Sequence, residues 1–257
     1  MGAPDEALDP AGGIKPLDLG LDGVIGSVDA NGRLIALNTF HPRHGFVTLT
    51  AADPFPEDRR YDPAEVRRYR ARLAGLEGFG PAAVGTARER AAALLSGALP
   101  RVRLALDDGS QAGMIAWASS GGAFQRWTLE EAAPWRGRLS LQRCAYTQLT
   151  EGGPVPMPAC AITGRFEDGV LTIENPALPW AAAFAGFLPG DPWERRADGP
   201  LEVDIAGRAG TTTLVYGFGP TAGAAREAAA RLASDPAASL DRTAADWASA
   251  LAGLPDD

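Results

Sequence analysis

Apolar and polar positions alternate with a period of two over most of the chain, which is the pattern of strands with one buried face. The first clear pair of strands is Val24–Val28 and Leu34–Leu37. Between them, Asn31 and Gly32 supply the positive φ angles of a tight hairpin turn. Phe46–Thr50 alternates as a third strand. We therefore expect the fold to begin with antiparallel strands.

Short strand-like segments continue after residue 100. Val102 and Leu104 point to one face while Arg101 and Arg103 point to the other, and Glu167-Asp-Gly169 is a second hairpin turn. The further segments are Met114–Ala118, Gln125–Leu129, Leu139–Leu149, Cys160–Phe166, Val170–Glu174, Leu201–Ile205 and Thr211–Tyr216. About ten such strands without alternating helices predict a mainly β protein, a large two-sheet antiparallel sandwich of the supersandwich type.

Residues 51–96 contain a long connection followed by two segments of helical character. Ala51–Tyr61 is rich in Pro, Asp and Glu and reads as a long connection. Pro63–Leu76 begins with a proline suited to the first position of a helix, and Thr86–Ser96 is rich in alanine. We expect both as short helical insertions in the sandwich.

The apolar period changes from two to nearly four after Gly217-Phe-Gly-Pro220. Ala225, Ala229 and Leu232 form one helical stripe. Ser234-Asp-Pro236 then supplies an N-cap and a first-turn proline for a second helix. The apolar stripe of that helix is Leu240, Ala244, Trp247, Leu251 and Leu254. The two stripes either pack back onto the sandwich or offer a docking surface to a following domain, and the sequence leaves both open.

Composition agrees with one globular β domain. The chain has 257 residues, of which 46% are apolar and 22% charged, so it is too apolar for general disorder. We divide it into a loose leader at 1–20, the β-sandwich at 21–218 and linker helices at 219–257. The formal net charge of −8 disfavours binding to the phosphate backbone of nucleic acids.

The sequence also indicates where the protein resides. Met1–Gly20 is acidic and rich in Pro and Gly, unlike a secretory signal. No stretch approaches the roughly 20 apolar residues of a membrane-spanning helix. Cys144 and Cys160 are the only cysteines and make no disulfide framework. A cytoplasmic protein with no membrane partner is the simplest expectation.

The order of these elements resembles a known arrangement. The segments that carry the resemblance are Gly23–Leu34, Thr213–Pro220, Ala224–Ser234 and Ala245–Leu251, the last with an Asp-Trp-x-x-x-Leu pattern. They resemble the N-terminal β-sandwich domain and linker helices of inverting glycoside hydrolases of the glucoamylase and glycogen-debranching type. In those families an (α/α)6 barrel follows and carries the catalytic carboxylates. The resemblance implies a barrel supplied in cis or in trans, and no catalytic residue in this chain.

His41-Pro-Arg-His44 is the stretch richest in candidate chemistry. Its arginine can present a multi-donor fork to sugar hydroxyls or to a carboxylate, and its histidines can donate or accept hydrogen bonds. Trp127, beside polar neighbours, adds a flat ring of the kind that stacks on sugars. The candidate substrate-binding residues are therefore His41, Arg43, His44 and Trp127. The alternatives are histidines that cap strand ends and a tryptophan in the core, and Trp180 and Trp193 in loops are expected to be more accessible.

Other catalytic or metal-binding arrangements find little support. Two histidines three apart, without a third nearby Cys or His, do not complete a tetrahedral zinc site. Glycoside hydrolysis needs a pair of carboxylates, and no pair is marked by its context. A nucleophile elbow and a phosphate-binding glycine-rich loop are both missing from the sequence. We therefore expect no cofactor, no metal and no activity from the chain alone.

Three functions remain open. The first is a non-catalytic N-terminal β-sandwich module of a glycoside hydrolase, which orients a following (α/α)6 catalytic domain and contributes to its sugar site. The second is a stand-alone carbohydrate-binding domain or a sugar epimerase resembling galactose mutarotases, although those enzymes place their histidines on strands facing a concave sheet. The third is a structural protein whose helices bind a partner chain.

Overall fold

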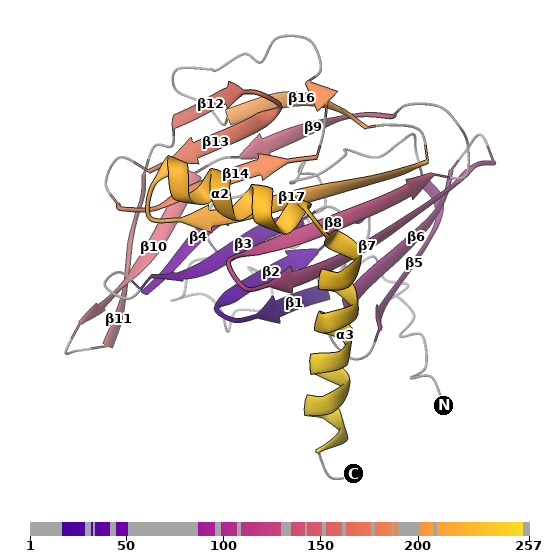
Figure 1. The fold of residues 1–257 in the computed structure, drawn as a ribbon, viewed down its shortest axis with the longest axis horizontal. Coiled ribbons are helices and arrows are strands. Elements are labelled where there is room, and N and C mark those ends of the chain that lie inside the picture. Colours follow the sequence, from indigo (N-terminus) through magenta and orange to yellow (C-terminus); the bar gives the residue numbers. More distant parts are fainter. Residues whose placement is uncertain are drawn as a thin grey trace, which may run out of the picture.

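The structure is a computed structural model, and it describes residues 17–28, 32, 34–41, 45–50, 87–95, 99–106, 109–129, 135–141, 143–150, 153–160, 163–175, 178–186, 188–189, 201–207 and 210–253. For some strand residues in these ranges only the course of the backbone is described. Within them the protein is mainly β, with three antiparallel sheets and two C-terminal helices (Figure 1). Neither of these two helices is both long and apolar enough to cross a membrane.

The six-stranded sheet has the order β1-β2-β3-β4-β10-β11. Its strands are β1 Leu17–Leu21, β2 Val24–Val28, β3 Leu34–His41, β4 Gly45–Thr50, β10 Arg143–Thr150 and β11 Gly153–Cys160. β1 and β2 are joined by Asp22 and Gly23, whose φ angles of 48° and 79° are those of a two-residue hairpin turn. The predicted hairpin of β2 and β3 is confirmed, because Gly26 pairs with Leu37 in antiparallel register.

The eight-stranded sheet has the order β12-β13-β14-β17-β8-β7-β6-β5. Its strands are β5 Ala87–Leu95, β6 Leu99–Leu106, β7 Gln111–Ser119, β8 Gly122–Leu129, β12 Thr163–Glu167, β13 Val170–Glu174, β14 Ala181–Ala185 and β17 Thr211–Gly219. A small third sheet joins β15 Leu188–Pro189, β16 Leu201–Gly207 and β9 Trp135–Leu141. The strand order places β17, which immediately precedes the helices in sequence, in the middle of the large sheet.

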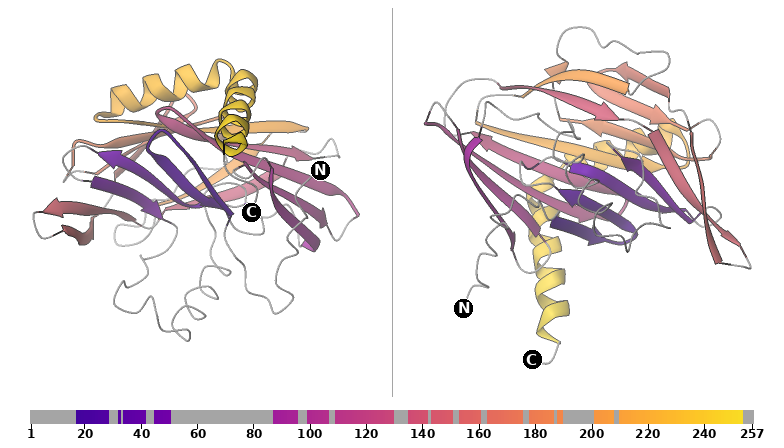
Figure 2. Two further views of the ribbon diagram at one scale, coloured as in Figure 1. Left: turned by 90° about the horizontal axis from the view of Figure 1, so that it is seen from below. Right: turned by 180° about the vertical axis from the view of Figure 1, so that it is seen from behind.

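The eight-stranded sheet lies between the six-stranded sheet and the helices, so the molecule has three layers (Figure 2). The core between the two sheets includes Leu19, Leu34, Leu37, Leu104, Met114 and Trp127. The core between the large sheet and the helices includes Trp117, Phe124, Val215, Ala225, Ala229 and Leu232. Strand alternation explains this division, since successive side chains of β7 and β8 point to opposite faces. The predicted antiparallel sandwich is confirmed.

Helix α2, Ala222–Ala233, lies directly on the backbone of β17. It begins at Thr221, whose hydroxyl accepts a hydrogen bond from the Ala224 amide at 3.2 Å. A Cβ atom at Gly217 of β17 would lie 2.4 Å from the backbone nitrogen of Ala229. Only a glycine at this position allows the helix to approach so closely, and alanines on the facing side of α2 complete the contact.

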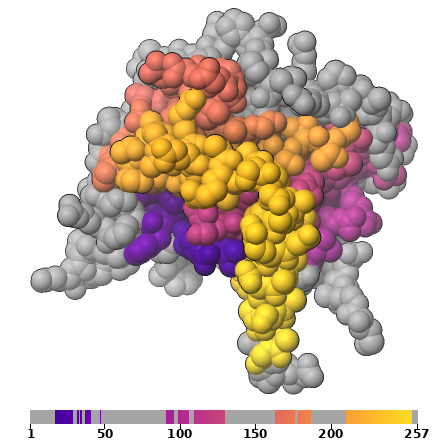
Figure 3. All heavy atoms as spheres, viewed as in Figure 1, coloured from indigo at the N-terminus to yellow at the C-terminus, as the bar shows by residue number. Residues whose placement is uncertain are grey.

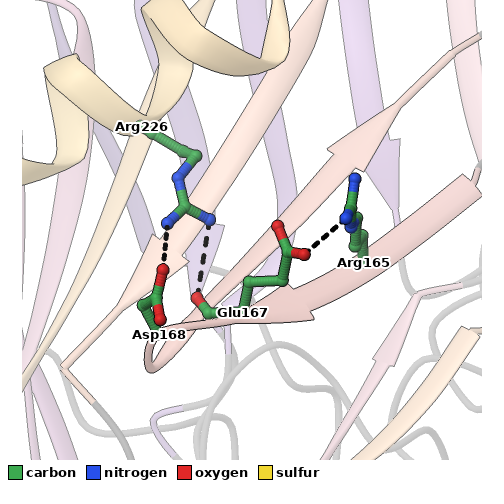
Figure 4. A network of polar contacts seen from close by, with 4 residues as sticks. All are labelled: Arg165, Glu167, Asp168 and Arg226. Carbon is green, nitrogen blue, oxygen red and sulfur yellow. Dashed lines mark hydrogen bonds and ion pairs between the residues drawn. The ribbon is translucent and has the colours of Figure 1, made fainter.

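The N-terminal half of α2 is linked to the turn between β12 and β13 (Figure 4). The Arg226 guanidinium lies 3.5 Å from the Asp168 carboxylate and donates to the Glu167 carbonyl oxygen at 3.5 Å. Arg165 pairs with the Glu167 carboxylate at 2.5 Å. These groups are largely exposed, so each pair contributes about 0–1 kcal/mol and mainly sets the position of the turn.

A buried polar contact joins the two sheets. The Gln125 side-chain amide of β8 donates to the Gly32 carbonyl oxygen at 2.8 Å, and the Tyr216 hydroxyl of β17 donates to the Gln125 side-chain oxygen at 2.5 Å. Gly32 has a φ of 76° and lies against Trp127, so this residue of the β2–β3 connection is buried in the core. The hydrogen bonds fix the position of Gly32 on the large sheet, because a buried polar group must be paired.

Tyr216 makes the stability of the protein depend on alkaline pH. Burial raises the pKa of the Tyr216 hydroxyl above its ordinary value, so the folded state keeps a proton that the unfolded state loses above about pH 10. The contribution of the protonated Tyr216 to the free energy of unfolding is therefore complete below that pH. It decreases as the pH rises, by about 1.4 kcal/mol at about pH 11.

Tyr216→Phe is expected to lower the free energy of unfolding by about 1–3 kcal/mol near neutral pH, because Gln125 loses its hydrogen-bond donor. In urea unfolding, the gap between wild type and variant should shrink between about pH 8 and about pH 11. A constant gap would contradict the raised pKa.

The helix predicted for Thr86–Ser96 is wrong, because Ala87–Leu95 forms β5 and pairs along its length with β6. Alanine favours a helix only weakly, and antiparallel pairing with a partly buried neighbouring strand outweighs that preference. The predicted connection Ala51–Tyr61 and helix Pro63–Leu76 lie outside the described residues.

Several predicted boundaries also shift. The leader was expected to reach Gly20, but Leu17–Leu21 is β1, and residues 1–16 lie outside the description. β3 continues to His41, which shortens the loop expected from Thr39 onward. The single strand predicted at Leu139–Leu149 is divided between β9 and β10 in different sheets. The two C-terminal helices begin and end close to their predicted positions.

Candidate functional site

Helix α3, Pro236–Ala252, is fixed to the large sheet by polar contacts along one face. Asp235 caps it by accepting from the Ala238 amide at 3.0 Å, and Pro236 occupies its first turn. The buried Ser239 hydroxyl accepts from the Trp117 indole at 3.3 Å. One turn later, the Thr243 hydroxyl donates to the Ala118 carbonyl oxygen of β7 at 3.0 Å.

The same face of α3 continues beyond the large sheet. Trp247 follows Thr243 by one turn and donates from its indole nitrogen to the Gly20 carbonyl oxygen of β1 at 3.2 Å. Leu251 follows by another turn and is 37% exposed. Residues four apart share a helix face, so these side chains form one row. The distal end of α3 stands out from the body of the molecule (Figure 3).

An apolar groove lies between the distal part of α3 and the edge of the six-stranded sheet. Its volume is about 720 Å³. Its apolar lining is Leu19, Leu21, Val24, Ile25, Phe40, Leu94 and Trp247. Phe40 is 51% exposed, Ile25 43% and Leu94 39%. Together with Leu251 they are the exposed large apolar side chains of the described part of the chain, and three of these four line one groove.

The β1–β2 turn shapes this groove. Asp22 and Gly23 reverse the chain, and the Gly23 carbonyl oxygen accepts a hydrogen bond from the Phe40 amide at 3.0 Å. That bond carries β3 alongside the turn and presents the Phe40 ring at the surface. Thr39, the preceding residue, points inward and accepts from the Trp180 indole at 2.8 Å. The alternation of β3 therefore directs Phe40 outward.

Acidic groups border the groove. Asp18 and Asp22 are both exposed at its rim, and Asp18 accepts a hydrogen bond from the Ser27 hydroxyl at 2.6 Å. A separate polar hollow of about 310 Å³ is lined by charged groups that include Asp22, Arg231, Arg242 and Asp246. Among the residues that the structure describes, no three His, Cys, Asp or Glu side chains lie close enough together to hold a metal ion. The groove thus offers apolar contact area with an acidic edge.

The sequence-predicted site residues fall in different places. His41 is the last residue of β3 and pairs with Gly45, directly after Phe40, but its side chain and all of Arg43 and His44 lie outside the described residues. Trp127 is 1% exposed in the core between the sheets, where a sugar in solution cannot reach its ring face. The expectation that Trp180 is accessible is wrong, since it is buried.

Trp247 belongs to the apolar stripe predicted for the second helix, but the other residues of the groove were not singled out by the sequence. Ile25 and Phe40 occupy outward positions of β2 and β3, and strand alternation could have marked them as large apolar residues on a solvent face. Leu94 lay in a segment expected to be helical. No local signal brings these residues together with Trp247, because their proximity depends on the packing of α3 against β1.

Comparisons with known proteins give a distant structural similarity. The sequence matches no protein-family model and no curated protein. The chain is distantly similar to galactose mutarotase-like β-sandwich proteins, among them HI1317, with a TM-score of 0.38, 10% identity, and coverage of 80% of this chain and 93% of that chain. Another is the "Putative aldose 1-epimerase" of Escherichia coli K12, with a TM-score of 0.41, 10% identity, and coverage of 80% and 99%. Similarity at this level specifies neither an activity nor a substrate for this chain.

Proposed function

We propose that the chain is a non-catalytic β-sandwich module of a carbohydrate-active enzyme, and that its apolar groove binds a helical catalytic domain. The observation that carries the proposal is the gathering of Ile25, Phe40 and Leu94 on the surface beside α3. Large apolar side chains that share one exposed surface mark interaction sites in soluble proteins. Leu251 extends the same apolar character along the helix.

The form of the groove suits a helix or the end of a helical bundle. One wall is α3 and the other is the edge formed by β1 and β2, so an added apolar helix would pack against both walls. The order of elements supports the carbohydrate-active assignment: a β-sandwich followed by two helices is the arrangement that the resemblance to glucoamylase-type enzymes predicts. The partner in this proposal is an (α/α)6 domain supplied in cis or in trans.

The chemistry belongs to the partner in this proposal. Asp18 and Asp22 are the acidic groups of the groove and both are exposed, whereas a glycosidase acid needs an apolar surrounding that keeps it protonated. The groove supplies contact area, and His41, the last residue of β3, follows the exposed Phe40 in sequence. His41, Arg43 and His44 are proposed to reach the sugar site next to it.

The test uses the (α/α)6 domain encoded downstream of this chain or in an adjacent reading frame. We expect the separately produced domain to form a one-to-one complex with the chain and to gain glycosidase turnover, while the chain alone has none. The absence of such a domain from the genomic neighbourhood, or turnover by the isolated chain, would refute the proposal.

Phe40→Asp tests most directly whether the groove binds the (α/α)6 domain. It places a charge at the most exposed apolar side chain of the groove, and we expect binding of the (α/α)6 domain to weaken by at least about thirtyfold, as for the loss of a main contact residue. Thr163→Asp, at an exposed position of β12 on the far edge of the large sheet, is the matched control and should leave affinity unchanged. Calorimetric titration of both variants measures the effect, and equal affinities would place the contact elsewhere.

Carbohydrate binding is the second candidate function for the same groove. Phe40 and Trp247 both line it, and Asp18 and Asp22 could accept hydrogen bonds from hydroxyl groups at its rim. Phe40→Leu separates the two functions, because leucine keeps apolar area but cannot stack on a sugar ring. Titration with maltoheptaose should then show a loss of at least about tenfold if a sugar stacks on Phe40, and domain docking should be almost unaffected.

A further inference from the structure

A second hollow lies on the helix side of the eight-stranded sheet and is lined by residues of β6, β7 and β8. Its volume is about 570 Å³. Three arginines line it: Arg101 and Arg103 from β6 and Arg126 from β8. The chain as a whole has a net charge of −8. The three arginines make the surface of this hollow positively charged, in contrast to the chain as a whole.

Strand register explains why these arginines face the same way. Arg101 pairs with Ile115 of β7, and Ile115 pairs with Arg126, so the two arginines lie in one row across three strands. Adjacent strands are about 4.8 Å apart, which places the Cα atoms of Arg101 and Arg126 about 10 Å apart. Arg103 lies two residues along β6 from Arg101, about 7 Å away on the same face. The three arginine side chains therefore start from one face of the sheet, with Arg103 and Arg126 each within about 10 Å of Arg101.

The positions of the arginines are partly fixed. The Arg126 guanidinium lies 5.2 Å from the centre of the Trp117 ring, which is itself stacked on Phe124. Arg101 and Arg126 are half-buried and Arg103 is exposed. Among the described side chains, no carboxylate forms an ion pair with any of the three. A half-buried guanidinium without a carboxylate is a ready binding group for an anion from solution.

At Gly113 the lining of the hollow is bare backbone, whereas Leu95 and Ile115 contribute apolar side chains to it. Gly113 of β7 pairs with Arg103 on one side and with Thr128 on the other. A Cβ atom at Gly113 would come no closer than 4.0 Å to another group, the Thr128 carbonyl oxygen, so the space above this residue is open. The Thr128 hydroxyl, which lies 3.3 Å from the Thr211 hydroxyl, and the Gln111 amide add polar groups at the edge.

We propose that this hollow, formed by Arg101, Arg103 and Arg126 over Gly113, binds a phosphate group, either inorganic phosphate or a phosphate monoester. Several guanidinium groups arriving from different strands suit a tetrahedral dianion, whose oxygens point in several directions. Gly113 leaves room for the anion to approach the sheet, and the ring of Trp117 holds Arg126 in place before binding. The site lies on a different face of the molecule from the apolar groove and is independent of the docking proposal.

The test is calorimetric titration of the full chain, in buffer of low ionic strength, with inorganic phosphate and with glycerol 3-phosphate. We expect saturable one-to-one binding of at least one of them, and acetate at the same concentration should give none. Arg103→Ala should weaken phosphate binding by at least about tenfold, since one charge-assisted contact is lost at an exposed position. Arg165→Ala, an exposed arginine on β12, removes the same charge elsewhere and should change the affinity by less than about twofold.

Gly113→Leu provides a second variant that changes no charge. Its side chain would fill the hollow, and we expect it to abolish phosphate binding while thermal unfolding shows a folded protein. The proposal is overturned if wild type shows no saturable binding of either phosphate compound, if Gly113→Leu binds normally, or if Arg165→Ala weakens binding as much as Arg103→Ala. The last outcome would show that only net charge attracts the anion.

Discussion

Replacing Trp117 by alanine is expected to lower the free energy of unfolding by about 3–5 kcal/mol, as for other fully buried tryptophans. The Trp117 ring is stacked on Phe124, with ring centroids 4.6 Å apart, between the large sheet and the helices. Its indole nitrogen also donates to Ser239, the first polar contact of α3. Truncation therefore leaves a cavity and loosens the helix that forms one wall of the groove.

Urea unfolding followed by circular dichroism measures this effect. Trp117→Phe is the matched variant, because it retains a ring against Phe124 and loses mainly the hydrogen bond to Ser239. We expect its cost to be clearly smaller than that of the alanine variant. A cost below about 1 kcal/mol for Trp117→Ala would contradict the packing of α3 against β7.

Gly217→Ala is expected to destabilise the protein by about 1–3 kcal/mol, because the added methyl group overlaps the backbone of α2. Its Cβ would lie 2.4 Å from the Ala229 nitrogen and 2.8 Å from the Ala225 carbonyl oxygen, and neither backbone atom can rotate away. The helix must move off the sheet, which exposes the alanines that it buries.

Gly113→Ala is the matched control for this variant. Gly113 lies in β7 of the same sheet, and its Cβ would approach nothing closer than 4.0 Å. Alanine should be neutral there or stabilise the strand by up to about 1 kcal/mol, since glycine loses more conformational freedom on folding. Equal effects of the two substitutions in thermal unfolding would show that α2 does not approach β17 so closely.

The sequence predicted the parts of the fold that depend on neighbouring residues. The β2–β3 hairpin follows from Asn31 and Gly32, and the change from strand to helix after β17 follows from a change in apolar period. The prediction from the sequence failed at β5, where an alanine-rich stretch forms a strand because β6 pairs with it. It also missed β14, Ala181–Ala185, another alanine-rich strand that is fully enclosed between β13 and β17.

The candidate sites were harder to predict because they depend on distant contacts. The apolar groove joins residues from β1, β2, β3, β5 and α3, and no spacing in the sequence brings Phe40 and Trp247 together. On α3, the residues buried most deeply are Ser239 and Thr243, whereas the apolar stripe predicted Leu240 and Ala244 as the contact face. The polar contacts arise because Trp117 and the Ala118 carbonyl group lie beneath the helix.

Hydrogen exchange of the complex with the (α/α)6 domain tests the central claim most directly. The docking proposal predicts slower exchange, on complex formation, in 17–28 and in the distal half of α3, and unchanged exchange in β12 and β13 on the far edge of the large sheet. Protection confined to β12 and β13, or no change around Phe40 and Trp247, would contradict the proposed role of the groove.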